Sequence, residues 1–184
     1  ILSFKDTIDK IILHEKNLGK GAAIKSAKEF ISGKYVIIQD ADLEYDPNDY
    51  EKLIEPLKKK ETKAVYGSRV LGKKRYNLKN FSSLSRVFFN HCLTILSNII
   101  NNQNLTDAHT CYKVFDTEVF NKLNLEEKRF GFCPEVTTKI SKLGYQISEI
   151  PIAYQGRNYE EGKKIGVIDG FDAIKCLIKY KFIN

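Results

Sequence analysis

The chain has 184 residues, of which 42% are hydrophobic and 29% charged, a composition typical of one globular domain with a sizeable core. It contains no run of about 18 uncharged apolar residues, which excludes a membrane-spanning segment within this sequence. The net charge of +7 suits an anionic partner such as a phosphorylated substrate, an anionic lipid surface or nucleic acid. Charge alone does not choose among these partners.

The cysteines Cys92, Cys111, Cys133 and Cys176 are scattered and form no CxxC pair. This spacing argues against a zinc site and fits a reducing compartment, where a free cysteine behaves as a small buried hydrophobe. The sequence has no methionine, even at position 1. We therefore expect that an N-terminal piece is missing.

Apolar β-branched runs alternate with helical patterns along the chain, which predicts a single α/β domain. A glycine introduces the first helical pattern, and a proline introduces the second, which ends in lysines. The continuous apolar run "YVII" is typical of a strand covered on both faces. The elements predicted in this half are a strand at 10–15, a helix at 19–31, a strand at 35–40, a helix at 47–60 and a strand at 63–70.

In the second half, a long pattern is strongly apolar on one side and predicts a helix. Another helical pattern stops at Gly144, and the last one is amphipathic and basic. The elements predicted here are a helix at 82–102, a mixed strand and helix pattern at 113–123, a helix at 132–145, a strand at 146–154 and a helix at 167–182.

The stretch "YVIIQDADLEYDP" ends an apolar strand in a cluster of carboxylates. If the chain stays extended, Asp40, Asp42 and Glu44 share one face and need a counter-charge. A hard divalent cation supplies that charge, and magnesium typically uses one or two carboxylates plus substrate phosphates. A solvated acidic loop is the alternative, and Asp46 is better explained as a helix cap. The position at a strand end, where open α/β sheets bind ligands, favours the metal for Asp40 and Asp42.

Two further segments follow a predicted strand. In "NLGKGAA", residues 17–23, glycines at a turn into a helix let backbone amides approach a phosphate or a base, although a plain tight turn explains them equally. In "GSR", Arg69 can bind a phosphate with two parallel hydrogen bonds or can form a surface ion pair.

In "LTDAHTCYKVF", Asp107 and His109 lie together after an asparagine-rich loop. Asp107 can act as a base or orient a phosphate, but a helix cap formed by Thr106 or Asp107 explains the same residues. We interpret His109 as structural.

The segment "YQGRNYEEGKKIG" places Arg157, Lys163 and Lys164 around a glycine-containing loop that can fold over a polyanion. An ordinary charged surface loop is the alternative, in which Tyr154 and Tyr159 are packing residues.

Taken in order from about residue 10 to 180, these segments and "RFGFCPE" resemble the family 2 glycosyltransferases. The likeness is greatest to the branch of dolichyl- or polyprenyl-phosphate sugar synthases. The resemblance implies one catalytic domain over 1–184 with a Rossmann-like GT-A fold, in which helices flank a mostly parallel sheet. It also implies that the N-terminal nucleotide-binding strand and helix are missing, so we expect this chain to bind nucleotide poorly and to be inactive.

The resemblance further implies roles for individual residues. Asp40 and Asp42 would bind Mg²⁺ or Mn²⁺ that bridges the donor diphosphate, and Glu44 stands where related synthases place a further metal-side ligand, often glutamine. The residues implied on the donor side are Asn17, Gly19, Lys20, Asp40, Ala41 and Asp42. The residues implied at the phosphates and the acceptor are Arg69, Arg86, Asn90, Arg157 and Lys164, with Asp107 and Arg69 at the catalytic centre.

The activity implied is an inverting, metal-dependent transfer of a hexose from a UDP- or GDP-sugar to polyprenyl (dolichyl) phosphate. The protein would lie at the cytoplasmic face of the membrane, with helices 82–102 and 167–182 either at the lipid interface or packed on the sheet. A phosphate acceptor is already ionised, so Asp107 would orient it and not deprotonate it.

Three alternative functions remain open at this stage. In the first, the acceptor is a saccharide or lipid hydroxyl in cell-envelope glycan synthesis, and Asp107 is the base. In the second, the domain binds a sugar nucleotide without catalysis. Nucleic-acid binding is the third, and the acidic strand end and the lack of a basic aromatic stripe count against it.

Overall fold

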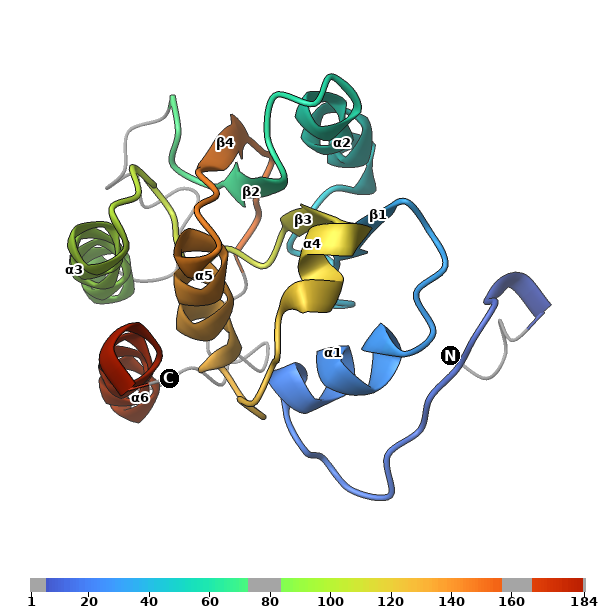
Figure 1. Cartoon of the computed structure of the whole chain (residues 1–184), viewed down its shortest axis with the longest axis horizontal. Coiled ribbons are helices and arrows are strands. Elements are labelled where there is room, and N and C mark those ends of the chain that lie inside the picture. The colour runs from blue at the N-terminus through green and yellow to red at the C-terminus, as the bar shows by residue number, and fades with distance from the viewer. Residues whose placement is uncertain (1–5, 73–83, 157–166, 184) are drawn as a thin grey trace.

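The computed structural model describes residues 6–72, 84–156 and 167–183, with the backbone alone for 84–86 and 167–169. Helices cover both faces of a four-stranded sheet, so the predicted α/β class is confirmed (Figure 1). The strands are β1 (Tyr35–Ile38), β2 (Ala64–Ser68), β3 (Lys113–Asp116) and β4 (Ile147–Pro151), in the order β1-β3-β2-β4.

The sheet is mixed. Strand β3 lies between β1 and β2 and runs antiparallel to both, whereas β2 and β4 are parallel. Strands β1, β2 and β4 therefore point the same way and β3 alone of the described strands is reversed, which agrees with the predicted mostly parallel sheet. The reversal of β3 itself was not predicted, because a strand covered on both faces reads as a continuous apolar run whichever way its neighbours point.

The helices begin and end at the predicted local signals. The Asp46 carboxylate accepts a hydrogen bond from the Asn48 amide at 2.9 Å, which confirms Asp46 as a cap. Gly144 has a φ of +83° just beyond a helix end, as predicted. The helical elements are α1 (Lys20–Lys28), a 3₁₀ turn (Pro47–Asp49), α2 (Tyr50–Lys58), α3 (Leu84–Asn101), α4 (Thr117–Lys122), α5 (Phe132–Lys142), α6 (Val167–Ile178) and a π-helical turn (Lys179–Ile183).

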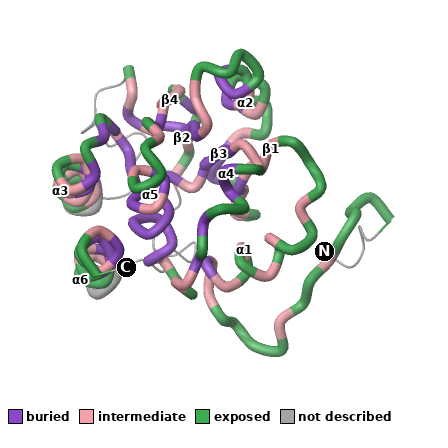
Figure 2. Tube along the Cα trace, in the orientation of Figure 1, coloured by how far each residue is buried: buried purple, intermediate pink, exposed green. Residues whose placement is uncertain are grey.

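The strand predicted at 10–15 is absent. Residues 8–19 form an arm without regular structure that leads into α1 and is mostly exposed (Figure 2). An apolar run becomes a strand only when a neighbouring strand pairs with its backbone. None of the described strands pairs with this arm, which explains why local hydrophobicity misled the prediction.

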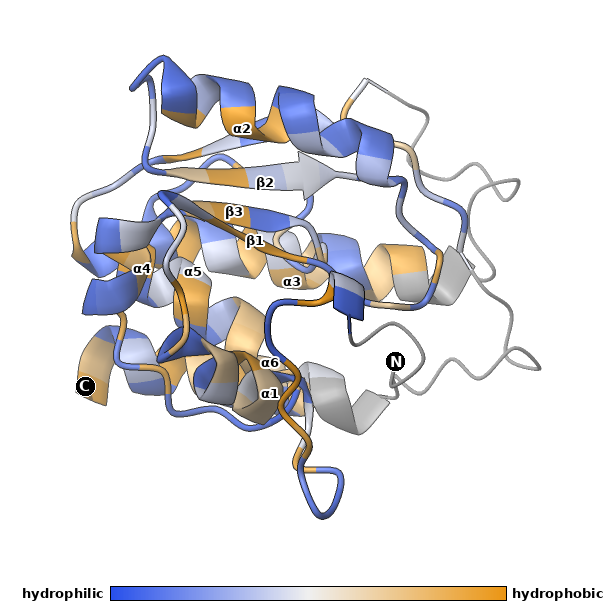
Figure 3. Ribbon diagram, turned by 90° about the vertical axis from the view of Figure 1, so that its right-hand side faces the viewer, coloured by the Kyte–Doolittle hydropathy of each residue, from blue (hydrophilic) through white to orange (hydrophobic). Residues whose placement is uncertain are grey.

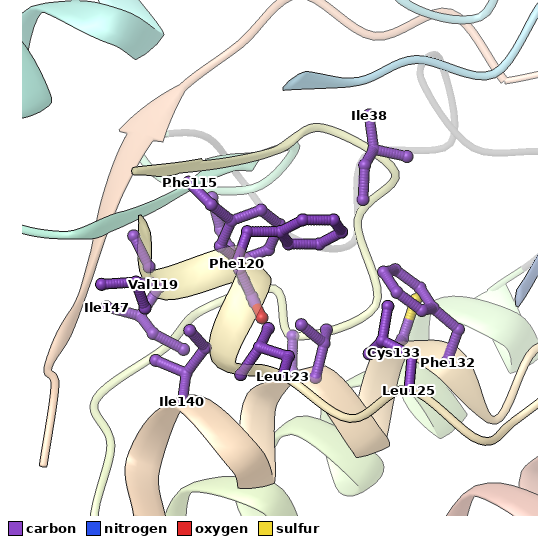
Figure 4. Packing of buried hydrophobic residues seen from close by; sticks show 14 of the residues in the cluster. Ile38, Phe115, Val119, Phe120, Leu123, Leu125, Phe132, Cys133, Ile140 and Ile147 are labelled. Atoms are coloured by element: carbon purple, nitrogen blue, oxygen red, sulfur yellow. The ribbon is translucent and has the colours of Figure 1, made fainter. Parts of the chain in front are cut away.

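Two apolar clusters hold the layers together. Alternate residues of β2 point to opposite faces, so Tyr66 packs toward α4 and α5 while Val65 packs toward α2. Figure 4 shows the first cluster, in which the rings of Phe115 and Phe120 stack with centroids 5.2 Å apart. Leu53 belongs to the second cluster, under α2. The side view places α2 on one side of the sheet and α3, α4 and α5 on the other (Figure 3).

The start of α1 is fixed by close packing. Gly19 has a φ of +94°, a conformation that favours glycine, and a Cβ atom on Gly21 would collide with the carbonyl oxygen of Glu127. The Ala22 amide donates to the Lys128 carbonyl at 3.0 Å. The glycines of "NLGKGAA" are therefore required by contact with the segment that precedes α5.

We expect Gly21→Ala to destabilise the fold by about 1–3 kcal/mol, because the new methyl group has no space against Glu127. The matched control is Gly170→Ala in α6, where a Cβ atom meets nothing within 4 Å. The control should be neutral or stabilise by up to about 1 kcal/mol, since alanine is the better helix former. Urea unfolding of both variants measures the difference. Equal effects would contradict the packing argument.

Candidate active site

A buried ion pair joins Arg69, just after β2, to Asp107 in the loop before β3. The distances are 2.7 Å from Nε to Oδ2 and 2.8 Å from Nη2 to Oδ1, and the backbone amide of Arg69 also donates to Oδ2 at 3.1 Å. Only 11% of the Arg69 side chain and 5% of the Asp107 side chain are exposed. The alternative of a surface ion pair is therefore wrong, because the pair is buried. Arg69 uses the planar two-bond geometry that also suits phosphate.

Glu149 in β4 fixes the loop that carries Asp107. Its carboxylate accepts from the amides of Thr106 at 2.6 Å and Asp107 at 2.9 Å. The Thr106 hydroxyl also donates to Glu149 at 2.8 Å and lies 2.6 Å from the Ser68 hydroxyl. No helix begins in this described loop, so the helix-cap explanation of Thr106 and Asp107 is wrong. Glu149 was not among the residues predicted from the sequence, although a lone acid inside an apolar strand pattern was the available signal.

The electrostatics make Asp107 a weak base. Burial alone would raise the pKa of this carboxyl group, but the charge and hydrogen bonds of Arg69 outweigh burial, so the pKa is lowered. Both carboxylate oxygens already accept hydrogen bonds from Arg69. In this arrangement Asp107 can orient neighbouring groups more readily than it can take a proton.

Lys113 supports the same loop from within the core. Its ammonium group donates to the carbonyl oxygens of Ala108 at 3.0 Å and Thr110 at 2.8 Å, and it lies 3.9 Å from the centroid of the Tyr66 ring. Burial lowers the pKa of Lys113. Lys113 was not predicted from the sequence either, where its signal was a lysine inside an apolar strand.

His109 lies on the loop anchored by Lys113. Burial, followed by the charge of Lys113, lowers the pKa of the imidazole to about 4. Its Nε2 atom is buried and has no hydrogen-bond partner among the described residues. The ring is therefore neutral at neutral pH, and its interpretation as structural stays a prediction.

On the opposite side of the site, the three predicted metal ligands have separate partners. The Asp42 carboxylate accepts from the Glu44 amide at 3.2 Å, while the Glu44 carboxylate accepts from the Tyr154 hydroxyl at 3.0 Å. Among the described residues, no three acidic, histidine or cysteine side chains are gathered to hold a metal ion. The reason is that Leu43 has a φ of +59°, so the chain is not extended beyond Asp42 and the expected convergence on one face does not occur.

Asp40 is engaged by two side chains. Lys20 Nζ lies 2.7 Å from Oδ1 and 2.8 Å from Oδ2, and the Cys111 thiol donates to Oδ2 at 2.6 Å. Burial raises the pKa of Cys111 to about 11, so the thiol is protonated and can be the donor. Burial alone would lower the pKa of Lys20, but the neighbouring acidic groups, Cys111 first, together outweigh burial, so the pKa is raised.

The chemistry of this strand end fits a hard divalent cation. Asp40 and Asp42 offer carboxylate oxygens, and both side chains are partly exposed. Mg²⁺ is commonly held by one or two carboxylates together with substrate phosphates, so a cluster of three acids is not required. The metal assignment of Asp40, Asp42 and Glu44 stays a prediction.

Tyr154 connects the two sides of the site. Its ring lies 5.1 Å from the Arg69 guanidinium carbon, and its hydroxyl reaches Glu44. A β-bridge pairs Tyr154 with Tyr45, and the Gln155 amide donates to the Glu44 carbonyl at 3.0 Å. The acidic strand end and the Arg69–Asp107 pair are therefore parts of one packed unit.

Two hollows border this unit. The first, beside the Arg69–Asp107 pair, is lined in part by Asn90 of α3. Asn17, Gly19 and Lys20 line the second, between the N-terminal arm and α1. The structure thus brings Asn90 to Arg69 and brings Lys20 to Asp40, as a shared site requires. The Arg86 side chain, Arg157, Tyr159, Lys163 and Lys164 lie outside the described residues.

The sequence model of the family described as "Glycosyl transferase family 2" matches residues 4–123, which is more than half of the chain. The chain therefore belongs to glycosyltransferase family 2.

Curated relatives extend over nearly the whole chain. It is 27% identical over 176 residues to a UDP-N-acetylglucosamine–dolichyl-phosphate N-acetylglucosaminyltransferase of Methanococcus voltae, covering 92% of this chain and 68% of the relative. It is 30% identical over 174 residues to a dolichyl-phosphate beta-glucosyltransferase of Trichomonas vaginalis, covering 90% and 52%. A dolichyl-phosphate beta-glucosyltransferase of Saccharomyces cerevisiae is 26% identical, with 92% and 53% covered. The chain thus spans between half and about two thirds of these proteins.

Solved structures show the same fold. Glucosyl-3-phosphoglycerate synthase from Mycobacterium tuberculosis superposes with a TM-score of 0.66 at 14% identity, covering 98% of this chain and 60% of the synthase. The same synthase in complex with Mn²⁺ and UDP-glucose also gives a TM-score of 0.66, at 15% identity with 95% and 57% covered. At this identity the likeness establishes the fold alone, and the predicted GT-A architecture is confirmed.

We expect Asp107→Ala to destabilise the fold by about 3–5 kcal/mol, because it leaves the buried Arg69 charge without a partner. Asp107→Asn keeps a hydrogen-bond acceptor and should cost less. The control is Glu55→Ala, which breaks the exposed ion pair with Lys59 and should leave the free energy of unfolding within error. Chemical denaturation of the three variants is the measurement. A loss for Asp107→Ala no larger than the control's would disprove the role of the pair.

Proposed function

We propose that this chain is the catalytic domain of an inverting glycosyltransferase that moves a hexose from a nucleotide-diphosphate sugar to a polyprenyl phosphate. The observation that carries the proposal is the buried Arg69–Asp107 pair. A phosphate acceptor is already ionised at neutral pH, so it needs a positioned cation and no strong base. Arg69 supplies the cation, and the lowered pKa of Asp107 disfavours the competing reaction with a hydroxyl acceptor.

Two cations, Arg69 and a bound metal ion, would serve the two phosphate groups of the reaction. The acceptor phosphate oxygen attacks the anomeric carbon while the bond to the nucleoside diphosphate breaks on the opposite face, which inverts the configuration. Arg69 orients the incoming phosphate, and Asp107 holds Arg69 in place. Asp40 and Asp42 would hold Mg²⁺ or Mn²⁺, which when bound neutralises the charge that develops on the leaving diphosphate.

Relatives support both substrates of this reaction. The names of relatives from Methanococcus voltae and Trichomonas vaginalis state that they transfer N-acetylglucosamine or glucose to dolichyl phosphate. A structural neighbour was crystallised with Mn²⁺ and UDP-glucose. Because the chain spans only about half of several relatives, we propose the substrates, the metal and the activity for the whole natural protein.

Exposed apolar side chains support contact with a membrane surface. In α3, Phe88, Phe89 and Ile99 are more than half exposed, and no charged residue occurs in this helix after Arg86. In α6, Phe171 is 63% exposed. None of the helices in the described ranges is long and apolar enough to cross a bilayer. We propose that these helices lie at the anionic cytoplasmic face of the membrane, where a lipid phosphate is presented.

The activity is tested in the full-length natural protein with radiolabelled UDP- and GDP-hexoses and polyprenyl phosphate. We expect label in the lipid fraction and a loss of ~10²-fold in Asp42→Asn, because the leaving diphosphate loses its metal. Asp46→Asn is the matched control and should retain activity, since Asp46 caps a helix. Label in a glycan would favour a hydroxyl acceptor. Donor binding without any product would favour a non-catalytic domain.

Membrane contact is tested by sedimentation with vesicles that contain anionic lipid. Phe88→Asp combined with Ile99→Asp should weaken binding by at least about tenfold, because burial of such side chains contributes about 1.5–3 kcal/mol each when complete. Leu143→Asp, an exposed change at the end of α5, is the control for added charge. Thermal unfolding should be unchanged in every variant. If the control binds as weakly as the double variant, the two helices are not the contact surface.

A further inference from the structure

The ion pair between Lys20 and Asp40 places a protein cation on a predicted metal ligand. Lys20 Nζ contacts both oxygens of the Asp40 carboxylate, at 2.7 Å and 2.8 Å. The pair is largely covered, with 15% of the Lys20 side chain and 29% of the Asp40 side chain exposed. The Cys111 thiol adds a third contact to the same carboxylate. Asp40 is therefore satisfied without any metal ion.

This contact is set by the backbone and is not a chance meeting of mobile side chains. Lys20 is the first residue of α1, and the left-handed Gly19 and the close approach of Gly21 to Glu127 fix where that helix begins. Asp40 follows the end of β1, and its carboxylate also accepts a hydrogen bond from the Cys111 thiol. Because packing positions the backbone at both ends, the ammonium group is held against the carboxylate that a divalent cation would need.

Resting on the proposed function, we infer that Lys20 is a resident counter-ion that competes with the divalent cation for Asp40. Two cations on one carboxylate repel each other, so a metal ion arriving alone must displace Lys20 from a covered ion pair. A nucleoside diphosphate offers Lys20 new anionic partners beside the same carboxylate. Lys20 therefore makes metal and donor bind together: each raises the affinity for the other.

This competition predicts a particular effect of removing the lysine. Lys20→Met abolishes the competitor, so the variant should bind Mn²⁺ more tightly than the unmodified chain when no nucleotide is present. The same variant should show a smaller gain in Mn²⁺ affinity on addition of a nucleoside diphosphate. A lysine that served only to attract the donor would leave the affinity for the metal alone unchanged or slightly altered by net charge.

The experiment titrates the full-length natural protein with Mn²⁺ and follows the free ion by electron paramagnetic resonance, with and without UDP or GDP. We expect Lys20→Met to bind Mn²⁺ at least about fivefold tighter without nucleotide, within the usual range of coupling between sites. Lys25→Met, an exposed position on the same helix, removes the same charge and should match the unmodified chain. Lys20→Arg retains a cation and should also resemble it. Circular dichroism verifies that each variant is folded.

A second variant tests whether the gain in Mn²⁺ affinity depends on Asp40. Adding Asp40→Asn to Lys20→Met should abolish the tighter binding, because the freed carboxylate is then absent. The inference is overturned by equal Mn²⁺ affinity in Lys20→Met and the unmodified chain, by a gain that persists with Asp40→Asn, or by the same gain in Lys25→Met. Sugar transfer by the full-length protein with no such gain would refute this inference alone. Tighter metal binding without any transfer would refute the proposed function alone.

Discussion

The structure of the site depends on the burial of one ion pair. Arg69 and Asp107 lose most of their hydration, a cost that only good geometry and further hydrogen bonds can offset. The geometry is supplied by two parallel bonds, and the further bonds come from the Arg69 amide and from Glu149, which holds the adjacent backbone. The loop before β3 consequently has little freedom, and Lys113 secures its far end.

The acidic strand end is held differently from the buried ion pair. Asp40 and Asp42 are partly exposed, Leu43 has a left-handed backbone, and Lys20 pairs with the Asp40 carboxylate. These contacts can be exchanged for ligand contacts at lower cost than the buried pair. The site thus combines a fixed half around Arg69 with an adjustable half around Asp40. Tyr154 touches both halves, through the Arg69 guanidinium group and the Glu44 carboxylate.

Local features of the sequence predicted much of the fold. Asp46 as a cap and Gly144 as a helix end are found, because each depends on residues within one turn. The glycine entrance to α1 is found as well, although its glycines are required by a distant contact with the segment that precedes α5. The failures concern distant partners. Residues 10–15 are apolar enough for a strand but no described strand pairs with them. The reversed direction of β3 within the mostly parallel sheet is likewise set by pairing that no local run reveals.

The sequence by itself determined the family, the order of the segments and the residue types that a donor and an acceptor site require. Only the tertiary structure decided which of these residues meet. Arg69 pairs with Asp107, which lies 38 positions further along the chain. Asp40 contacts Cys111, which lies 71 positions further along. Glu149 and Lys113 join the site for the same reason. Such partners are set by the strand order β1-β3-β2-β4, a long-range property that spacing along the chain does not encode.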